Sequence, residues 1–363
     1  MNILGDSDCD DVRLMKSGLV QLSEGQPIEA GAAGTVFRFL ALRASRVTGK
    51  HRINGTPRLM ERPQEELLKI FSQMGVTATQ DKQGMDIETR GWTPQGDTLL
   101  VPSQRSSQFL TSVLFNSWDL PFDLYVSAGG KKVSEGYFQM SLRLAEKLGL
   151  KIEFWDGDFR IRRGQKPLAG DYRAEMDMGS AFALCAVAAV NGKVTLTDFP
   201  QHSLQPDAIF VDILEKMGAP IARMGDHMRV EKANRLNGVI FEIDRAPDLF
   251  PVLAALAALA EGPSQLFGGP QLVHKESNRL EQMGNLLRQL GREVQVLPDG
   301  MKILGDTPAK PTGQKIVFDC DEDHRLAFAT AVLIAAGFDI EVRNPQVVKK
   351  SFPEFWSILG WGH

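Results

Sequence analysis

Cationic side chains recur in the polar segments of this 363-residue sequence, and their type and spacing suggest chemistry. Arginine and lysine are the side chains that bind carboxylate and phosphate. One charged loop usually indicates only a solvated surface, but recurrence at matching places in a chain of net charge -4 favours convergence on a shared anionic ligand. The cations concerned are Arg58, Arg62, Lys131, Lys132, Lys275, Arg279, Lys349 and Lys350.

Two small polar segments precede apolar runs and could complete such an anion site. Residues 31–35 read GAAGT, which lets a ligand approach the backbone, and residues 106–108 read SSQ, which offers two hydroxyls and an amide. The first N–H groups of a helix have no partner within the helix and attract negative charge. Taken alone, however, GAAGT favours tight helix packing, and SSQ is equally compatible with a helix cap.

Carboxylates lie beside these cations and are candidates for proton transfer. Asp248 stands in RAPDLFP, and Glu276 directly follows Lys275. The run DHR at 323–325 is a further polar cluster, but not part of a serine triad, because neighbouring residues at a helix start point in different directions. The sequence has no Walker A, HExxH or paired CxxC pattern and no GxGxxG after a strand, so we expect neither a nucleotide cofactor nor structural zinc.

The composition is that of a globular protein, since 43% of the residues are hydrophobic and 24% are charged. The slight acidic excess argues against a protein that binds nucleic acid through a basic surface. Cys9, Cys185 and Cys320 are odd in number and far apart, which fits structural residues in a reducing compartment. The longest apolar run, residues 251–260, is too short to span a membrane. We therefore expect a cytoplasmic monomer that binds neither membrane nor nucleic acid.

A module of about 70 residues recurs along the chain and must position these groups. Each copy has a small or polar cluster, an apolar helix, a short strand, a polar connector, and a second helix that ends in Leu-Gly or Met-Gly. Consecutive end glycines are 69 to 74 residues apart, and glycine suits this place because it adopts the left-handed conformation without steric cost. The predicted helix ends are Gly75, Gly149, Gly218, Gly291 and Gly360.

The two helices of a module differ in pattern. The first helices are almost wholly apolar and are predicted to be buried. The second helices, such as that over residues 62–75, place apolar residues three and four apart with charges between, as expected of a helix with one solvated face. The chain is therefore predicted to be an α/β protein whose apolar helices face inward. The first helices start near residues 34, 106, 179, 247 and 323.

The chain opens on a segment that resembles the closing half of a module. Residues 9–19, CDDVRLMKSGL, have the pattern of a second helix, with a predicted helix end at Gly18. We therefore expect the first module to be incomplete. About half of a module, with one buried helix and its strand, would precede Met1 to complete it.

Seven motifs, in this order, resemble the 5-enolpyruvylshikimate-3-phosphate synthase family over essentially the whole chain from Asp8 onward. They are GAAGTxxR, GxPRxxERP, SSQFLTSxL, PDLFPVLAALA, HKESNRL, DHR and KKSFPEFW. The resemblance implies a two-domain, inside-out α/β barrel of repeated βαβαββ-type units, the first incomplete, with domains at 1–173 and 174–363. It implies transfer of the enolpyruvyl group of phosphoenolpyruvate to the 5-hydroxyl of shikimate 3-phosphate, with release of phosphate and no metal or organic cofactor.

The same resemblance implies roles for individual residues. Asp248 and Lys275 would bind the shikimate hydroxyls and help to remove the proton of the attacking oxygen, while Glu276 would protonate the methylene carbon. Shikimate 3-phosphate would be bound by Ser106, Ser107, Gln108, Ser134, Tyr137, Asp248, Gln271 and Lys275. Phosphoenolpyruvate would be bound by Gly34, Arg62, Gln108, Arg279, Arg325 and Lys350.

Departures from the family pattern leave alternatives. The family has a Lys-x-x-Gly-Ser-Lys-Ser type loop in its first half-module, which this sequence lacks, so we expect impaired activity. The related UDP-N-acetylglucosamine enolpyruvyltransferases usually have a reactive cysteine on a mobile loop, whereas Cys185 lies in an apolar helix, which weakens that alternative. A third interpretation is a non-catalytic remnant that binds anionic ligands. Glycine at position 34 predicts sensitivity to the inhibitor glyphosate if the site is intact.

Overall fold

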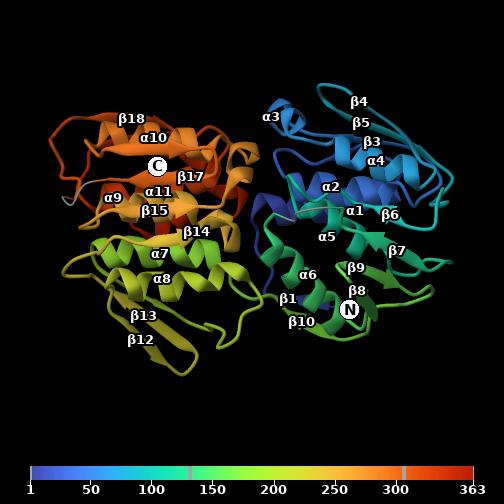
Figure 1. Cartoon of the computed structure of the whole chain (residues 1–363), viewed down its shortest axis with the longest axis horizontal. Helices are drawn as coiled ribbons and strands as arrows, with labels where there is room; N and C mark the ends of the chain where they lie inside the picture. Colours follow the sequence, from blue (N-terminus) through green and yellow to red (C-terminus); the bar gives the residue numbers. More distant parts are fainter. Residues whose placement is uncertain (1, 130–132, 305–307, 363) are drawn as a thin grey trace. The chain divides into compact units, whose positions relative to one another are not determined.

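The computed structural model describes residues 2–129, 133–304 and 308–362, and the chain folds into two compact units (Figure 1). The first unit comprises Met1–Ala174 and the second Glu175–His363. Each unit has its own hydrophobic core. Among the residues described, no helix is both long enough and apolar enough to cross a membrane.

The first unit repeats one arrangement of strands and helices. Its elements in chain order are β1 (Asn2–Leu4), α1 (Asp10–Ser23), β2 (Ile28–Glu29), α2 (Gly34–Ala44), β3 (Gly49–Asn54), α3 (Pro57–Glu61), α4 (Glu65–Gln73), β4 (Thr77–Gln80), β5 (Gly84–Thr89), β6 (Leu99–Leu100), α5 (Gln108–Phe115), β7 (Leu124–Ser127), α6 (Glu135–Lys147), β8 (Ile152–Trp155), β9 (Asp158–Ile161) and β10 (Asp171–Arg173). They form sheets in the orders β2-β3-β5-β4 and β6-β7-β9-β8, and β1 pairs with β10. In both four-stranded sheets the first pair is parallel and encloses a buried helix in the sequence, whereas the following hairpin is antiparallel.

In its described residues, the second unit contains one four-stranded sheet of the same arrangement and two smaller sheets. Its elements in chain order are α7 (Met178–Val190), β11 (Lys193–Leu196), η1 (Pro206–Ile209), α8 (Phe210–Met217), β12 (Ile221–Met224), β13 (His227–Glu231), β14 (Ile240–Glu242), η2 (Ile243–Arg245), η3 (Pro247–Leu249), α9 (Phe250–Ala258), β15 (Ser264–Phe267), η4 (Pro270–His274), α10 (Arg279–Gln289), β16 (Val294–Leu297), β17 (Gly300–Ile303), β18 (Ile316–Asp319), α11 (His324–Ala335), β19 (Ile340–Arg343), η5 (Pro345–Lys350) and α12 (Phe355–Ile358), where η marks a short 3-10 helix. Its sheets have the orders β11-β13-β12, β14-β15-β17-β16 and β18-β19.

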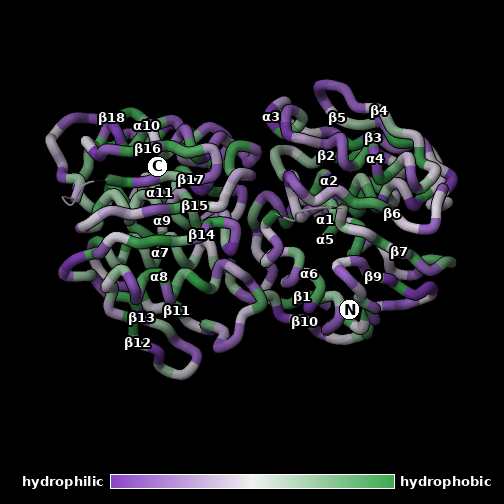
Figure 2. The backbone as a smooth tube through the Cα atoms, in the orientation of Figure 1, coloured by the Kyte–Doolittle hydropathy of each residue, from purple (hydrophilic) through white to green (hydrophobic). Residues whose placement is uncertain are grey.

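The first helix of each module is buried, as its apolar sequence predicts. Every residue of α9 is buried, and α7 and α11 pack against it. Figure 2 shows that the residues of these helices are predominantly hydrophobic. In the first unit α2 packs against α5. Burial of one leucine or phenylalanine side chain contributes about 1.5–3 kcal/mol, so these helices supply much of the stability of each core. The second helices are amphipathic: α4 buries Leu67, Ile70 and Phe71 and exposes Lys69.

The five glycines predicted to end the second helices all adopt the left-handed conformation, which confirms these helix ends. An L-residue with a side chain takes this conformation only at a steric cost, so glycine stops the helix there. The φ angles are +69° at Gly75, +97° at Gly149, +93° at Gly218, +81° at Gly291 and +73° at Gly360.

The helix end predicted at Gly18 is wrong. Helix α1 continues through Gly18 to Ser23, and the left-handed glycine that follows is Gly25, with φ +70°. Gly18 serves packing instead, because a Cβ atom at this position would lie 2.4 Å from Cδ1 of Leu40 in α2. The glycine lets α1 approach the buried helix closely.

Candidate active site

The second unit gathers charged side chains at the starts of its buried helices. Asp248 lies in η3 just before α9, and Arg325 lies in the first turn of α11. The Arg325 guanidinium lies against Gly179 in the first turn of α7, where a Cβ atom would be 2.0 Å from Nη1. These contacts place the starts of the three helices at the same end of the core, where unpaired N–H groups favour negative charge.

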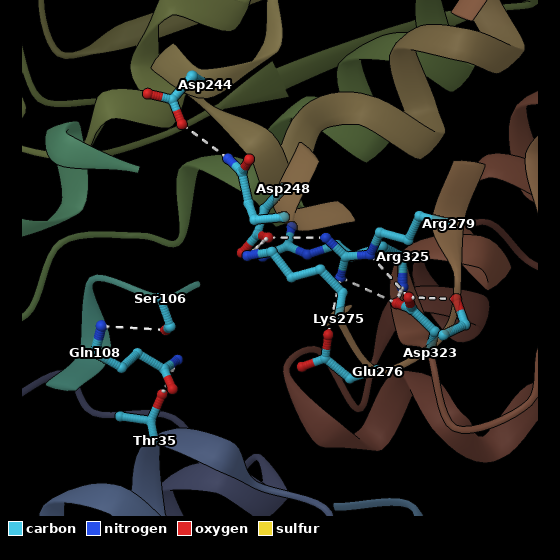
Figure 3. A network of polar contacts seen from close by, with 12 residues as sticks. Thr35, Ser106, Gln108, Asp244, Asp248, Lys275, Glu276, Arg279, Asp323 and Arg325 are labelled. Atoms are coloured by element: carbon cyan, nitrogen blue, oxygen red, sulfur yellow. Dashed lines mark hydrogen bonds and ion pairs between the residues drawn. The ribbon is translucent and has the colours of Figure 1, made fainter. Parts of the chain in front are cut away.

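Asp248 lies among three cations (Figure 3). Its Oδ1 accepts hydrogen bonds from Lys275 Nζ at 3.1 Å and from Arg279 Nη1 at 2.8 Å. Its Oδ2 is 3.9 Å from Arg325 Nη2. Burial by itself would raise the pKa of this carboxyl, but Lys275, Arg279 and Arg325 together hold the pKa well below its usual range. Asp248 is therefore ionised and can accept a hydrogen bond from a hydroxyl.

Arg279 is the most deeply buried of these cations, with 1% of its side chain exposed. At the start of α10, its Nη2 donates to Glu276 Oε2 at 3.2 Å and its Nε donates to Asp323 Oδ2 at 2.8 Å. Burial by itself would lower the pKa of the guanidinium, but Asp323, Asp248 and Glu276 raise the pKa well above its ordinary value. Arg279 is thus a fixed cation with the carboxyl group of Glu276 directly beside it.

Lys350 and His324 are two further buried residues of this region. Lys350 ends η5, and His324 opens α11. The Nδ1 atom of His324 has no hydrogen-bond partner among the described residues. Burial, together with the cations Arg325 and Lys350, lowers the pKa of His324 well below its usual range. The imidazole is therefore neutral near pH 7, and the nearby positive charge comes from arginine and lysine.

Gln271 lies in η4 and donates through Nε2 to Asp244 Oδ1 at 2.9 Å. The structure thus joins most predicted site residues of the second unit in one network of ion pairs, whereas Gln271 contacts a different carboxylate, that of Asp244. The members of that network are Asp248, Lys275, Glu276, Arg279 and Arg325.

The first unit has a separate polar network at the starts of α2 and α5. Gln108 accepts through Oε1 from Arg38 Nη1 at 2.6 Å and donates through Nε2 to Thr35 Oγ1 at 3.0 Å. The Ser106 hydroxyl oxygen accepts from the backbone N–H of Gln108 at 3.2 Å. Because Arg38 occupies the amide oxygen, the orientation of the Gln108 amide is set and its NH₂ faces Thr35.

Arg62 lies against the start of α2. A Cβ atom at Gly34 would be 3.0 Å from Arg62 Nη1, so the missing side chain lets the guanidinium approach the helix start. The segment GAAGT therefore lets a cation lie close to the helix start. The sequence of this segment by itself favours tight helix packing only. Ser107 precedes α5 and is buried, but makes no side-chain cap hydrogen bond.

Ser134 and Tyr137 lie at the start of α6, which packs against α5. Ser134 is buried and adopts the left-handed conformation with φ +53°. Of the other connector cations, Arg58 pairs with Glu61 at 3.0 Å and Lys349 is exposed. Lys131 and Lys132 lie outside the described residues.

Sequence reasoning missed residues that orient the candidate groups. Arg38 and Thr35 hold Gln108, and Asp323, which accepts a hydrogen bond from Ser277, holds Arg279. Asp323 directly precedes an apolar helix, and a polar residue at that place is the signal of an N-cap. No signal in the sequence connects Asp323 to Arg279, which lies 44 residues earlier.

Comparisons with known proteins agree over both units. Residues 3–359 match the family model for EPSP synthase (3-phosphoshikimate 1-carboxyvinyltransferase). A 3-phosphoshikimate 1-carboxyvinyltransferase of Methanoculleus marisnigri is 34% identical over 336 residues, covering 92% of this chain and 78% of the relative. The protein of that name from Pyrococcus abyssi is 32% identical over 337 residues, covering 93% and 78%.

Solved structures show the same fold. The EPSP synthase from Acinetobacter baumannii matches with a TM-score of 0.70 at 22% identity, over 92% of this chain and 78% of that chain. The enolpyruvyl transferase NikO from Streptomyces tendae matches with a TM-score of 0.65 at 18% identity, over 89% and 75%. The inside-out, two-domain α/β fold expected from the sequence motifs is thereby confirmed.

Proposed function

The chain belongs to the EPSP synthase family, and we propose that the two polar networks described above bind its substrates and transfer its protons. The reaction joins the enolpyruvyl group of phosphoenolpyruvate to the 5-hydroxyl of shikimate 3-phosphate and releases phosphate, in the shikimate pathway to aromatic amino acids. The observation that most directly supports the proposed roles is the placement of Asp248 among three cations. The two compact units are assigned to the two enolpyruvyltransferase domains of the family.

Phosphoenolpyruvate combines a carboxylate and a phosphate in one small molecule, so its site needs several fixed cations. The tetrahedral intermediate of the transfer keeps both groups, and cations that are already oriented stabilise it without further reorganisation. This assignment is supported by the burial of the Arg279 guanidinium and by the close contact of the Arg325 guanidinium with Gly179. The residues assigned to phosphoenolpyruvate are Gly34, Arg62, Gln108, Arg279, Arg325 and Lys350.

Shikimate 3-phosphate offers hydroxyl donors and a phosphate, which require hydroxyl, amide and carboxylate partners. The Gln108 amide is held in one orientation by Arg38, which supports its use as a donor. Lys275 and Asp248 form a hydrogen-bonded pair that can bind one hydroxyl oxygen and its proton together. The residues assigned to shikimate 3-phosphate are Ser106, Ser107, Gln108, Ser134, Tyr137, Asp248, Gln271 and Lys275.

Glu276 and Asp248 are assigned the proton transfers. Glu276, which must carry a proton at the start of the cycle, protonates the methylene carbon. The 5-hydroxyl oxygen then bonds to the neighbouring carbon while its proton passes to Asp248, with Lys275 holding that oxygen. In the second phase the new methyl group returns a proton to Glu276, the carbon–oxygen bond to phosphate breaks, and phosphate leaves. The proton on Asp248 passes to the departing phosphate, which leaves as hydrogen phosphate, so the cycle closes with Asp248 again a carboxylate and Glu276 again protonated.

The cations around Asp248 connect its base strength to substrate binding. In the free protein they hold its pKa low, which makes it a weak proton acceptor. Bound phosphoenolpyruvate would bring negative charge to Arg279 and Arg325 and offset their effect on the neighbouring carboxylate. The pKa of Asp248 is therefore expected to rise in the complex in which the base is needed.

The alternatives are not favoured. The curated relatives are named 3-phosphoshikimate 1-carboxyvinyltransferase, which does not favour a UDP-N-acetylglucosamine enolpyruvyltransferase. Burial also raises the pKa of the Cys185 thiol in α7, so Cys185 is no reactive thiolate. A non-catalytic remnant that binds anions would bind phosphoenolpyruvate without releasing phosphate, and the assay below separates it from an enzyme.

A cytoplasmic monomer remains our proposal for the state of this protein. The three cysteines, which are all free and buried, support a reducing compartment. The partners proposed are phosphoenolpyruvate and shikimate 3-phosphate alone, without nucleic acid, membrane or cofactor. Glyphosate is expected to compete with phosphoenolpyruvate, since Gly34 leaves space beside Arg62.

A phosphate-release assay with both substrates tests this function. We expect release that needs both substrates, and glyphosate inhibition that more phosphoenolpyruvate relieves. Calorimetric titration of shikimate 3-phosphate, with and without glyphosate, gives binding independently of turnover. Binding without phosphate release would favour the remnant, and the absence of both would contradict the proposed site.

A further inference from the structure

We propose that Asp323 is a positioning residue that acts through Arg279 and holds its guanidinium in the plane needed for phosphoenolpyruvate. The inference rests on the proposed function, since it concerns the residue assigned there to this substrate. Asp323 itself is 0% exposed, so its effect on a ligand must pass through the groups that it binds.

Each of the two carboxylate oxygens of Asp323 accepts two hydrogen bonds. Oδ2 accepts from Arg279 Nε at 2.8 Å and from Ser277 Oγ at 2.9 Å. Oδ1 accepts from Arg279 Nη2 at 3.2 Å and from the backbone N–H of Arg325 at 3.0 Å. One buried carboxylate therefore binds the side chain of one arginine of the site and the backbone of the other.

The bidentate contact determines which edge of the guanidinium remains for other groups. Arg279 presents its Nε and Nη2 edge to Asp323, and this fork geometry fixes the plane of the group. Nη1 is then directed to Asp248 at 2.8 Å, and Nη2 also reaches Glu276 at 3.2 Å. Without Asp323, rotation about the side-chain bonds would move both contacts together.

Ser277 restrains the carboxylate itself. Ser277 is 1% exposed, and its hydroxyl donates to Asp323 Oδ2, the oxygen that also accepts from Arg279 Nε. Ser277 belongs to the short segment between Glu276 and Arg279, so the same segment that provides two site residues also restrains the partner of one of them. Loss of this hydroxyl should loosen Asp323 but leave its ion pair with Arg279.

Stability alone does not explain why such a pair is buried. Burying two charges costs desolvation energy that their attraction often only offsets, so a buried ion pair adds little net stability. A pair with 1% and 0% exposed side chains beside the proposed site is better explained by the orientation that it imposes.

The main test replaces Asp323 by asparagine. Asparagine is as good an N-cap as aspartate and keeps the acceptor for the Arg325 N–H, but places an NH₂ group where Arg279 donates. For Asp323→Asn we expect the KM for phosphoenolpyruvate to rise about 10- to 100-fold, the loss typical of one charged hydrogen bond. The Kd of shikimate 3-phosphate should change by less than about threefold, since neither the Lys275–Asp248 hydrogen bond nor the first-unit network involves Asp323. Ser277→Ala should raise the same KM by only about two- to fivefold.

Asn278→Ala is the matched control at the start of the same helix. Asn278 caps α10 by accepting from the Glu281 N–H at 3.3 Å and has no part in the proposed roles. This variant should lose stability as expected of a lost cap while keeping the KM for phosphoenolpyruvate. A KM increase of equal size in Asn278→Ala and Asp323→Asn would overturn the inference, because it would show a general effect of the helix start.

The double variant Arg279→Ala/Asp323→Asn tests whether Asp323 acts through Arg279. Arg279→Ala leaves a buried carboxylate without its cation, and Asp323→Asn then removes that charge. The double variant should unfold at the same temperature as Arg279→Ala or higher, and its KM for phosphoenolpyruvate should equal that of Arg279→Ala within about threefold. Full additivity of both effects would overturn the inference.

The outcomes also separate the inference from the proposed function. A wild-type protein that releases phosphate, with a KM that Asp323→Asn leaves unchanged, overturns the inference alone. A wild-type protein that binds phosphoenolpyruvate without turnover, with affinity weakened by Asp323→Asn, supports the inference and overturns the reaction. A wild-type protein that does not bind phosphoenolpyruvate overturns both.

Discussion

Asp248→Asn separates the charge of this carboxylate from its shape. The substitution removes the negative charge that two cations share, since Arg279 Nη1 and Lys275 Nζ lie 2.8 Å and 3.1 Å from Asp248 Oδ1. Unit charges about 4 Å apart at an effective dielectric constant of about 20 attract by about 4 kcal/mol, and leaving a buried charge unpaired typically costs about 3–5 kcal/mol. Asp248 keeps 27% of its side chain exposed, so solvent screening reduces the expected loss to about 2 kcal/mol.

Thermal unfolding and turnover measure two consequences of this change. A loss of about 2 kcal/mol should lower the melting temperature of the second unit by about 4–8 °C. Added phosphate should stabilise the variant more than the wild type, because the freed cations bind the anion in place of the carboxylate. The kcat should fall about 10²- to 10⁴-fold, as expected on loss of a proton acceptor.

Glu341→Gln is the control for the change in net charge. Glu341 pairs with Lys315 at 2.7 Å on the surface of the same unit, and its replacement should alter neither turnover nor the response to phosphate. The reasoning would be refuted if Asp248→Asn kept kcat within tenfold of the wild type and gained no extra stabilisation from phosphate.

Three further substitutions test other parts of the structure. Arg38→Met removes the donor that orients the Gln108 amide, so calorimetry should show a rise of about tenfold in the Kd of shikimate 3-phosphate. An unchanged Kd would show that Gln108 binds this substrate without being oriented by Arg38. His324→Asn should flatten the pH dependence of stability, because the lowered pKa keeps the folded imidazole neutral while the unfolded imidazole binds a proton below about pH 6.5. Wild-type stability therefore falls toward acid pH by up to about 1.4 kcal/mol per pH unit. Chemical denaturation at pH 5 to 7 should show a smaller slope of stability against pH in the variant. Gly34→Ala puts a Cβ atom 3.0 Å from Arg62 Nη1. Steady-state kinetics should therefore show a rise of about tenfold in both the KM for phosphoenolpyruvate and the inhibition constant of glyphosate. Unchanged values would place the ligand away from α2.

The repeated modules were predictable because their signals are local. An almost wholly apolar helix such as α9 must be buried wherever it lies, and a glycine after a helix can take a positive φ whatever surrounds it. The error at Gly18 shows the limit of this reasoning. A glycine inside a helix has the same letter as a glycine that ends one, and only the neighbouring Leu40 decides that Gly18 is needed for close packing.

The sequence alone therefore determined the order of the modules, the buried helices, and the residue types that can bind anions and move protons. The tertiary structure decided how those residues are paired. Asp323 lies two residues before Arg325 in the chain, yet its side chain also binds Arg279, and Arg38 orients Gln108 across 70 residues. The physical reason is that propensity and periodicity depend on nearest neighbours, whereas the partner of a buried charge depends on which helix starts the packed core brings within about 3 Å.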